Sequence, residues 1–240
     1  MTGAPPAITS AADLAPLIEH TALKPETTPA AIGQLCDQAI RFGLRGVCVN
    51  PLYVALARRH LEGATARPLV VSVVGFPLGA NLSATKAAET RAVIDAGADE
   101  VDMVLPIGRL KAGELDAVFD DIAAVVVAAG GKPVKVILET LLLDEREKIA
   151  ACSVSARAGA AFVKTSTGFG GSHATVEDVA LMRRVVGAEM GVKAAGGVRD
   201  LDGMKAMIAA GASRVGASAG VKIVQQARGE QPAAAPSSGY

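Results

Sequence analysis

The amino-acid sequence predicts an α/β protein that folds as a single closed (β/α)8 barrel. The chain has 240 residues, close to the roughly 250 that such a barrel needs. Short apolar or β-branched runs, typical of buried strands, alternate with longer segments that carry helix caps. There are eight such runs, and eight parallel strands close a sheet on itself. We therefore expect one barrel domain over residues 1–224, with a short N-terminal helix before the first strand.

The strands and helices are expected to alternate along the whole chain. The strands fall at residues 18–23, 45–50, 69–77, 100–106, 133–140, 161–167, 191–196 and 214–218. Helical segments lie at residues 83–96, 114–129, 144–158, 175–186 and 201–210, several of them opened by a Ser, Thr or Asp cap. Three helices end in Ala-Gly-Ala, where Gly97, Gly159 and Gly211 are expected in the left-handed C-cap conformation. Strands that alternate with helices pair in parallel through right-handed crossovers.

An open, doubly wound sheet is the structural alternative to the barrel. That fold has edge strands and usually a glycine-rich phosphate fingerprint after its first strand. Here Lys24, Pro25 and Glu26 follow the first strand, so the closed barrel is favoured. From residue 225 to residue 240 the composition changes to Pro, Ala, Ser and Gly, and we expect a flexible C-terminal tail there.

Composition and charge indicate a small-molecule partner. The 24 basic and 24 acidic side chains cancel, which gives no electrostatic reason to expect nucleic acid or an anionic membrane surface. No apolar run is long enough to span a membrane or to form a signal peptide. The cysteines contain no CxxC pair, and His20, His60 and His173 lack ligand spacing. We therefore expect a cytoplasmic protein without a metal site.

Two lysines lie where stability alone would not place them. Lys164 and Lys193 each interrupt a predicted strand that runs into a glycine turn. A cationic ammonium on a buried strand is costly unless it is paired or loses its proton. Neighbouring lysines repel each other, and this repulsion is one way to obtain an uncharged, nucleophilic lysine near neutral pH. The pattern indicates a site that needs a reactive amine.

Two further charges, Asp102 and Lys135, also interrupt predicted strands. Reactive groups of a barrel gather at the carboxyl ends of its strands, where the βα loops form a pocket. One interpretation of these charges is an assembled catalytic site. The other is a set of buried ion pairs that fills the barrel. For Lys135 we expect a carboxylate partner, which is Glu19, Asp102 or Glu139.

These segments together resemble the deoxyribose-phosphate aldolase family. The resemblance covers essentially the whole chain and is carried by the runs IEHTALKP (18–25), EVDMVLP (100–106), FVKTSTG (162–168), VKAAGG (192–197) and RVGASAG (214–220). KTSTG combined with KAAGG is far more specific than either run alone. The resemblance implies a class I aldolase that reversibly cleaves 2-deoxy-D-ribose 5-phosphate into D-glyceraldehyde 3-phosphate and acetaldehyde in carbohydrate catabolism. It implies no metal or organic cofactor.

The resemblance also implies a role for each unusual charge. Lys164 would form a Schiff base with the aldehyde of the open-chain sugar. Lys193 would keep Lys164 unprotonated, and Asp102 would move protons through a water. The phosphate is expected on backbone N–H groups of glycine-rich turns and of a helix N-terminus, late in the barrel. The residues expected to contact it are Thr167, Gly168, Gly196, Gly197, Gly216 and Ser218.

A few positions depart from the family pattern or stand apart from it. Relatives often have two serines in the last turn, whereas Ser218 is followed by Ala219, and some have a lysine where this chain has Phe169. Both changes predict weaker phosphate binding and relative tolerance for unphosphorylated aldehydes. Cys48 is expected to be a small buried hydrophobe, although a thiol there could meet an aldehyde. Tyr240 is either a disordered end or, as in some relatives, a terminal tyrosine that assists proton transfer.

Two other functions remain open from the residues alone. Another phosphate-binding barrel, such as an isomerase or epimerase, would use carboxylates or a metal and would form no covalent adduct. A binding or regulatory barrel would have little use for Lys164, Lys193 and Asp102, because buried charges are costly to keep. The aliphatic helical exterior predicts a homodimer.

Overall fold

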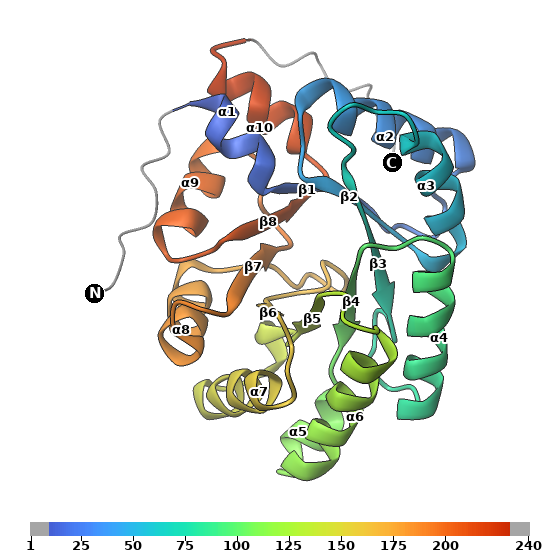
Figure 1. The fold of residues 1–240 in the computed structure, drawn as a ribbon. Coiled ribbons are helices and arrows are strands. Elements are labelled where there is room, and N and C mark those ends of the chain that lie inside the picture. Colours follow the sequence, from blue (N-terminus) through green and yellow to red (C-terminus); the bar gives the residue numbers. More distant parts are fainter. Residues whose placement is uncertain (1–9, 231–240) are drawn as a thin grey trace.

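The computed structural model describes residues 10–230 and forms a closed barrel of eight parallel strands (Figure 1). The strands follow one another around the barrel in chain order, and β8 pairs with β1 to close it. The predicted (β/α)8, or TIM, barrel is therefore confirmed. The open sheet is wrong, because every strand of the described sheet is paired on both sides.

All eight strands lie inside the predicted runs. They are β1 (Ile18–Ala22), β2 (Gly46–Val49), β3 (Leu69–Val74), β4 (Glu100–Val104), β5 (Val134–Ile137), β6 (Phe162–Lys164), β7 (Gly191–Ala195) and β8 (Arg214–Ala217). Each strand ends earlier than predicted at its carboxyl end. Beyond these ends the chain leaves the sheet and forms the loops around the mouth of the barrel.

The helices surround the barrel (Figure 1). They are α1 (Ala11–Leu14), α2 (Pro29–Phe42), α3 (Val54–Leu61), α4 (Ser83–Asp95), α5 (Ile107–Lys111), α6 (Leu115–Ala128), α7 (Glu145–Arg157), α8 (Val176–Val186), α9 (Leu201–Ala209) and α10 (Gly220–Ala227). Single 3-10 turns occur at Ala15–Leu17, Pro51–Tyr53 and Thr140–Leu142. The predicted short N-terminal helix is α1, whose N-terminus is capped by a reciprocal capping box between Ser10 and Asp13.

Helix ends follow the local chemistry of the sequence. Gly97, Gly159 and Gly211 all have positive φ, at 107°, 83° and 111°, so the three Ala-Gly-Ala signals end helices as predicted. The C-terminal tail begins later than the predicted residue 225, because α10 continues to Ala227. Gln226 supports this last turn by accepting a hydrogen bond of 2.9 Å from the Leu201 N–H at the start of α9. Tyr240 lies outside the described residues.

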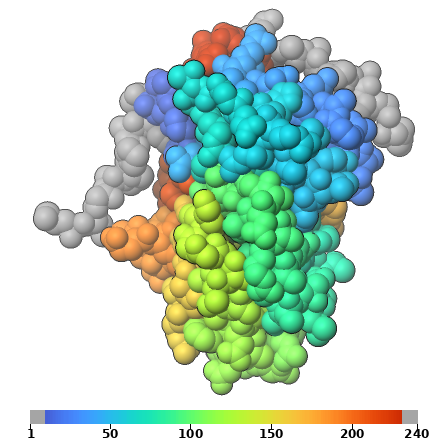
Figure 2. All heavy atoms as spheres, turned by 45° about the vertical axis from the view of Figure 1, so that its right-hand side comes forward, coloured from blue at the N-terminus to red at the C-terminus, as the bar shows by residue number. Residues whose placement is uncertain are grey.

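The main hydrophobic core lies between the outer faces of the strands and the helices. Val47 and Val49 of β2 point into this core with Ile32 and Leu35 of α2. A smaller apolar cluster, which includes Cys48 and Val71, lies inside the barrel. In Figure 2 the helices form a continuous outer surface on one side, blue to cyan for α2 and α3 and green for α4 and α6. The interior of the barrel holds this small cluster together with buried charged side chains.

Candidate active site

The pairing register stacks the inward-facing side chains of the barrel in layers, because alternate residues of each strand point to the axis. One layer contains Glu19, Val71, Lys135 and Lys193, from the odd-numbered strands. The layer above it, nearer the carboxyl ends of the strands, contains Cys48, Asp102, Lys164 and Gly216. The charges that were anomalous in the sequence are thus neighbours inside one barrel.

Asp102 lies at the centre of this group. Its Oδ2 accepts hydrogen bonds from Lys164 Nζ at 2.8 Å and from Lys193 Nζ at 2.7 Å. Its Oδ1 accepts a third from Lys135 Nζ at 2.8 Å. Lys164 is 2% exposed and the other three side chains are fully buried. Both interpretations of the sequence therefore meet here, since the candidate catalytic residues are also members of a buried ion network.

Two glutamates and an arginine complete the network. Glu19 pairs with Lys193 and with Arg214, the latter at 2.8 Å. Glu100 lies 2.7 Å from Lys135 and 3.2 Å from Arg214. Lys135 therefore contacts Asp102 and Glu100, and lies 3.4 Å from Glu19. Of the three carboxylates predicted as alternative partners, Asp102 and Glu19 therefore lie beside Lys135, and Glu139 is not among its contacts in the described chain.

The network contains one more basic side chain than acidic ones. Three carboxylates (Glu19, Glu100 and Asp102) face four basic side chains (Lys135, Lys164, Lys193 and Arg214). Full ionisation would leave one excess positive charge in a buried space, which is unfavourable. Among the described residues Lys164 has one carboxylate partner, whereas each of the other three bases has two or more. Lys164 is thus the base with the fewest carboxylate partners in the network.

Burial and neighbouring charges act in opposite directions on the other ionisable groups. Burial alone would raise the pKa of Asp102, but Lys135, Lys164 and Lys193 hold this pKa well below its usual value. Burial opposes the charge of Lys193, yet Asp102 and Glu19 raise its pKa above the usual lysine value. Asp102 is therefore a carboxylate and Lys193 an ammonium at neutral pH.

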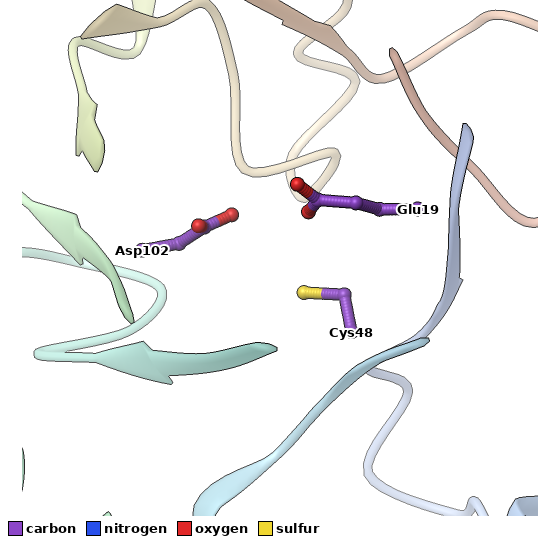
Figure 3. A group of neighbouring side chains, drawn as sticks. All are labelled: Glu19, Cys48 and Asp102. Atoms are coloured by element: carbon purple, nitrogen blue, oxygen red, sulfur yellow. The ribbon is translucent and has the colours of Figure 1, made fainter. Parts of the chain in front are cut away.

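Cys48 lies beside the two central carboxylates (Figure 3). Its sulfur and one oxygen each of Glu19 and Asp102 lie within 4.8 Å of one another. This spacing could suit a cation, but both carboxylates already face ammonium or guanidinium groups. Burial raises the pKa of the Cys48 thiol. The predicted buried, unionised cysteine agrees with this environment.

Several residues expected to contact phosphate lie in exposed turns at the carboxyl ends of β6, β7 and β8. Gly168 and Gly197 are exposed, and Gly196 is partly exposed. A Cβ on Gly196 would lie 2.7 Å from the Ser172 carbonyl oxygen, so only glycine fits there. Ser218 is exposed just after β8. These turns offer backbone N–H groups at one side of the mouth.

Gly216 and Thr167 are placed differently. Gly216 lies within β8 and is buried. A Cβ there would lie 3.0 Å from Lys193 Cε, so the absence of a side chain leaves room for that lysine. Thr167 is also buried, and its hydroxyl donates to Glu139. Neither residue is exposed at the mouth with the glycine turns.

Glu139 is a site residue whose position the sequence did not reveal. It is buried, and its φ of 58° is the one positive value of a non-glycine residue in the described chain. Its carboxylate accepts hydrogen bonds from the Thr167 N–H at 3.2 Å and from the hydroxyls of Thr167 and Ser172. A glutamate at the end of a strand was the available signal. The positive φ of Glu139 and its hydrogen bonds to the loop after β6 could be recognised only in the folded structure.

Phe169 lies at the apolar side of the mouth. Its ring meets Phe76 edge-on, with centroids 5.3 Å apart. A cavity of about 230 Å³ lies beside it. The cavity is lined mainly by apolar residues, including Pro77, Leu78, Ile107, Leu141, Leu142 and Phe169. A lysine at position 169 would lie beside the Phe76 ring and this apolar cavity.

Comparison with known proteins decides the family. A family model described as DeoC/LacD family aldolase matches residues 17–226. The chain belongs to this aldolase family. The matched region contains all eight strands and every residue of the buried ion network.

Relatives of this aldolase family cover most of the chain. The deoxyribose-phosphate aldolase of Thermotoga maritima is 56% identical over 213 residues, which are 89% of this chain and 85% of the relative. That of Thermococcus gammatolerans is 55% identical over 218 residues, 90% of this chain and 97% of the relative. The deoxyribose phosphate aldolase structure from Aeropyrum pernix superposes with a TM-score of 0.85 at 32% identity, covering 92% and 93% of the two chains.

None of the helices within residues 10–230 is both long enough and apolar enough to cross a bilayer.

Proposed function

We propose that this chain is a class I deoxyribose-phosphate aldolase, which reversibly cleaves 2-deoxy-D-ribose 5-phosphate into D-glyceraldehyde 3-phosphate and acetaldehyde. The observation that carries the proposal is the single carboxylate oxygen of Asp102 shared by Lys164 and Lys193. This contact puts a candidate nucleophile beside a permanent cation and a proton acceptor. The names of the relatives support the same substrate.

Lys164 is the proposed nucleophile. Its neutral amine adds to the C1 aldehyde of the open-chain sugar, and the resulting carbinolamine loses water to give an iminium. Loss of the C3 hydroxyl proton then breaks the C2–C3 bond, and the bonding electrons move to the iminium nitrogen. The products are glyceraldehyde 3-phosphate and an enamine on Lys164. Protonation of the enamine at C2, followed by hydrolysis, releases acetaldehyde and restores the amine.

Lys193 and Asp102 support these steps. The raised pKa of Lys193 keeps this side chain cationic, so its charge opposes a proton on the neighbouring Lys164. The lowered pKa of Asp102 keeps it a carboxylate, which passes protons on, through a water, rather than storing one. Lys135 holds the other oxygen of Asp102 and so fixes the orientation of the carboxylate.

The phosphate is proposed to bind at the turns after β6, β7 and β8. Gly168, Gly196 and Gly197 supply N–H groups there, and Ser218 supplies a hydroxyl. The N-terminus of α10 follows directly, and no side chain caps it, so its dipole and free N–H groups favour an anion. By contrast, the side chain of Asp200 caps α9. Gly216 and Thr167 are buried and would contribute indirectly. Gly216 leaves room for Lys193, and Thr167 fixes the loop after β6 by its hydrogen bond to Glu139.

Borohydride trapping tests the Schiff base. Reduction in the presence of acetaldehyde is expected to add a two-carbon group to Lys164, detected by peptide mass spectrometry. An isomerase, an epimerase or a binding module would give no adduct. The matched control is Lys205→Arg on α9, which is expected to label like the unmodified protein. An adduct on Lys193 in place of Lys164 would contradict the proposed assignment of roles.

The assembly and compartment are further parts of the proposal. We propose a homodimer, supported by exposed apolar side chains such as Leu52 and Val127, each 80% exposed. The relative from Aeropyrum pernix is tetrameric, so light scattering in solution is the deciding measurement.

A cytoplasmic location is supported by three free, buried cysteines, Cys36, Cys48 and Cys152. A role for Tyr240 in proton transfer is tested by comparing the chain with one that ends at residue 230.

A further inference from the structure

The three hydroxyl residues after Lys164 differ in their hydrogen bonding. The Thr165 hydroxyl donates to the Ala195 carbonyl at 2.9 Å and accepts from the Ala195 N–H at 3.0 Å. The Thr167 hydroxyl donates to Glu139. The Ser166 hydroxyl is fully buried and has no hydrogen-bond partner among the described residues. The fold therefore uses two of these hydroxyls and leaves the middle one free.

Ser166 faces the same side of the barrel as Lys164. Sheet-like pairing continues past the end of β6, because the Thr165 N–H donates to the Lys193 carbonyl at 3.1 Å and the Thr165 carbonyl accepts from the Thr140 N–H at 3.1 Å. Residues two apart on an extended chain share a face. Ser166 thus lies one step nearer the mouth than the Lys164 side chain.

Ser166 also lies against the glycine turn after β7. A Cβ on Gly196 would lie 3.5 Å from Ser166 Cβ. Along the chain Ser166 therefore lies one inward-facing step beyond Lys164, and its Cβ lies beside the turn at Gly196. In the proposed reaction Lys164 and this turn are the places of sugar carbon C1 and of the phosphate on C5.

A buried hydroxyl without a partner is unfavourable unless a water or a ligand pairs with it. An alanine would fill the same place without this penalty, and alanines are abundant on the adjacent β7, as Ala194 and Ala195. Thr140 has the other unpaired buried hydroxyl of the described chain. It lies in the 3-10 turn after β5, whereas Ser166 follows the candidate nucleophile Lys164 by two residues in the same segment. Ser166 thus has the placement expected of a group that contacts the substrate.

We propose that the Ser166 hydroxyl hydrogen-bonds the C4 hydroxyl of the open-chain sugar, an inference that rests on the proposed function. The reacting C3 oxygen lies nearer to Lys164 and Asp102, whereas C4 adjoins the phosphate-bearing carbon at the Gly196 turn. In the synthetic direction this hydroxyl is the C2 hydroxyl of D-glyceraldehyde 3-phosphate. Ser166 would therefore make the site prefer a hydroxylated acceptor aldehyde over one that lacks the hydroxyl.

The test compares two acceptors with the full-length enzyme and acetaldehyde. One acceptor is D-glyceraldehyde 3-phosphate, and the other is 3-oxopropyl phosphate, which has the same phosphate but no hydroxyl. Ser166→Ala is expected to lower kcat/KM for the first by about tenfold, the worth of one hydrogen bond in a buried site. For the second acceptor the expected change is less than about twofold on the same basis. Borohydride labelling of Lys164 should be unchanged.

Stability measurements separate this role from a structural one. Ser166→Ala should leave the Tm unchanged or raise it, because the hydroxyl has no partner in the fold to lose. The control Ser155→Ala removes a buried hydroxyl that donates to Ala151 in α7, and it should lower the Tm without changing the ratio between acceptors. Ser166→Gly provides a second variant with the same expected loss of acceptor preference.

Three results would overturn the inference. Equal losses of kcat/KM for both acceptors would assign the hydroxyl to the reacting oxygen or to packing. A lower Tm for Ser166→Ala would show that the fold itself uses the hydroxyl. Absence of aldolase activity with both acceptors in the unmodified enzyme would overturn the proposed function and this inference together, whereas the first two results leave the proposed function standing.

Discussion

Asp102 combines a structural role in the ion network with the reactive role proposed for it. Three lysine amino groups donate to its two oxygens, so the carboxylate compensates positive charge that would otherwise be costly in the barrel. The same contacts hold Lys164 and Lys193 at hydrogen-bond distance from one oxygen. Any change at this residue therefore affects both the stability of the interior and the geometry of the amines.

The first prediction concerns Asp102→Asn. An asparagine keeps the shape but removes the charge, so Lys135 and Lys193 lose their shared counter-ion. We expect a loss of about 3 kcal/mol of stability in urea unfolding and a fall of at least about 100-fold in kcat/KM, since general acid–base contributions are of this size. Asp121→Asn is the matched control, because Asp121 is a buried partner of Lys86 outside the site. Equal kcat for the folded fractions of both variants would contradict the prediction.

The second prediction concerns Phe169 and Ala219, where the chain departs from the family pattern. We expect the unmodified enzyme to prefer the phosphorylated sugar only weakly. The double variant Phe169→Lys with Ala219→Ser should raise the ratio of kcat/KM between 2-deoxyribose 5-phosphate and 2-deoxyribose by about tenfold, since hydrogen bonds to charged groups contribute about 1.5–3 kcal/mol. Parallel kinetics with both sugars measure this ratio. An unchanged ratio would show that the glycine turns alone decide the phosphate preference.

At the scale of the elements, the site depends on how one loop holds the next. The turn after β5 contributes Glu139, which binds the loop after β6 at Thr167 and Ser172. That loop in turn packs on the turn after β7, where the Ala174 N–H donates to the Gly196 carbonyl at 3.0 Å. The glycine turns proposed for phosphate are therefore positioned by a carboxylate that lies outside the ion network.

The third prediction concerns Glu139→Gln. A glutamine offers one acceptor oxygen where the carboxylate accepts from three donors, so the loop after β6 should loosen. We expect KM for 2-deoxyribose 5-phosphate to rise about tenfold, the equivalent of one to two lost hydrogen bonds, with kcat changed much less. KM for unphosphorylated 2-deoxyribose should change little. A fall in kcat with both sugars at constant KM would instead assign Glu139 to the chemistry.

At the scale of the whole molecule, the barrel is stabilised by an outer apolar core and carries an inner charged one. The apolar residues between strands and helices form one continuous cluster. Inside, seven ionisable side chains from six strands point toward the barrel axis, where most barrels of this kind pack aliphatic side chains. Such an interior makes stability depend on pH in a defined direction.

The fourth prediction concerns acid stability. Burial alone would raise the pKa of Glu19, but Lys135 and Lys193 lower it from 4.5 to about 2. Between these two values the unfolded chain binds a proton that the folded chain does not, so stability falls as the pH falls through this window. The slope should approach about 1.4 kcal/mol per pH unit for this one group. Urea unfolding between pH 2 and pH 5 should give a shallower slope for Glu19→Gln than for the unmodified protein, and parallel slopes would contradict the assignment.

Several features were predictable from the sequence for local reasons. Strand positions followed from β-branched runs, and helix ends from glycines such as Gly97 and Gly211. Lys164, Lys193 and Asp102 were recognised because a charge on a buried strand is unusual whatever its partners. By contrast, the carboxyl ends of the strands were predicted too long, since an apolar run does not reveal where the chain leaves the sheet. The positive φ of Glu139 had no local signal either.

The sequence by itself determined the closed barrel and the identity of its unusual charges, because periodicity, caps and anomalous residue types are properties of short segments. The tertiary structure alone decided which charges meet. Within residues 10–230, Lys135 meets Asp102, Glu100 and Glu19 rather than Glu139. Gly216 leaves space for Lys193, and the Ser166 hydroxyl has no partner there. Each of these outcomes depends on the register between strands far apart in the chain, and that register is set by closure of the whole barrel.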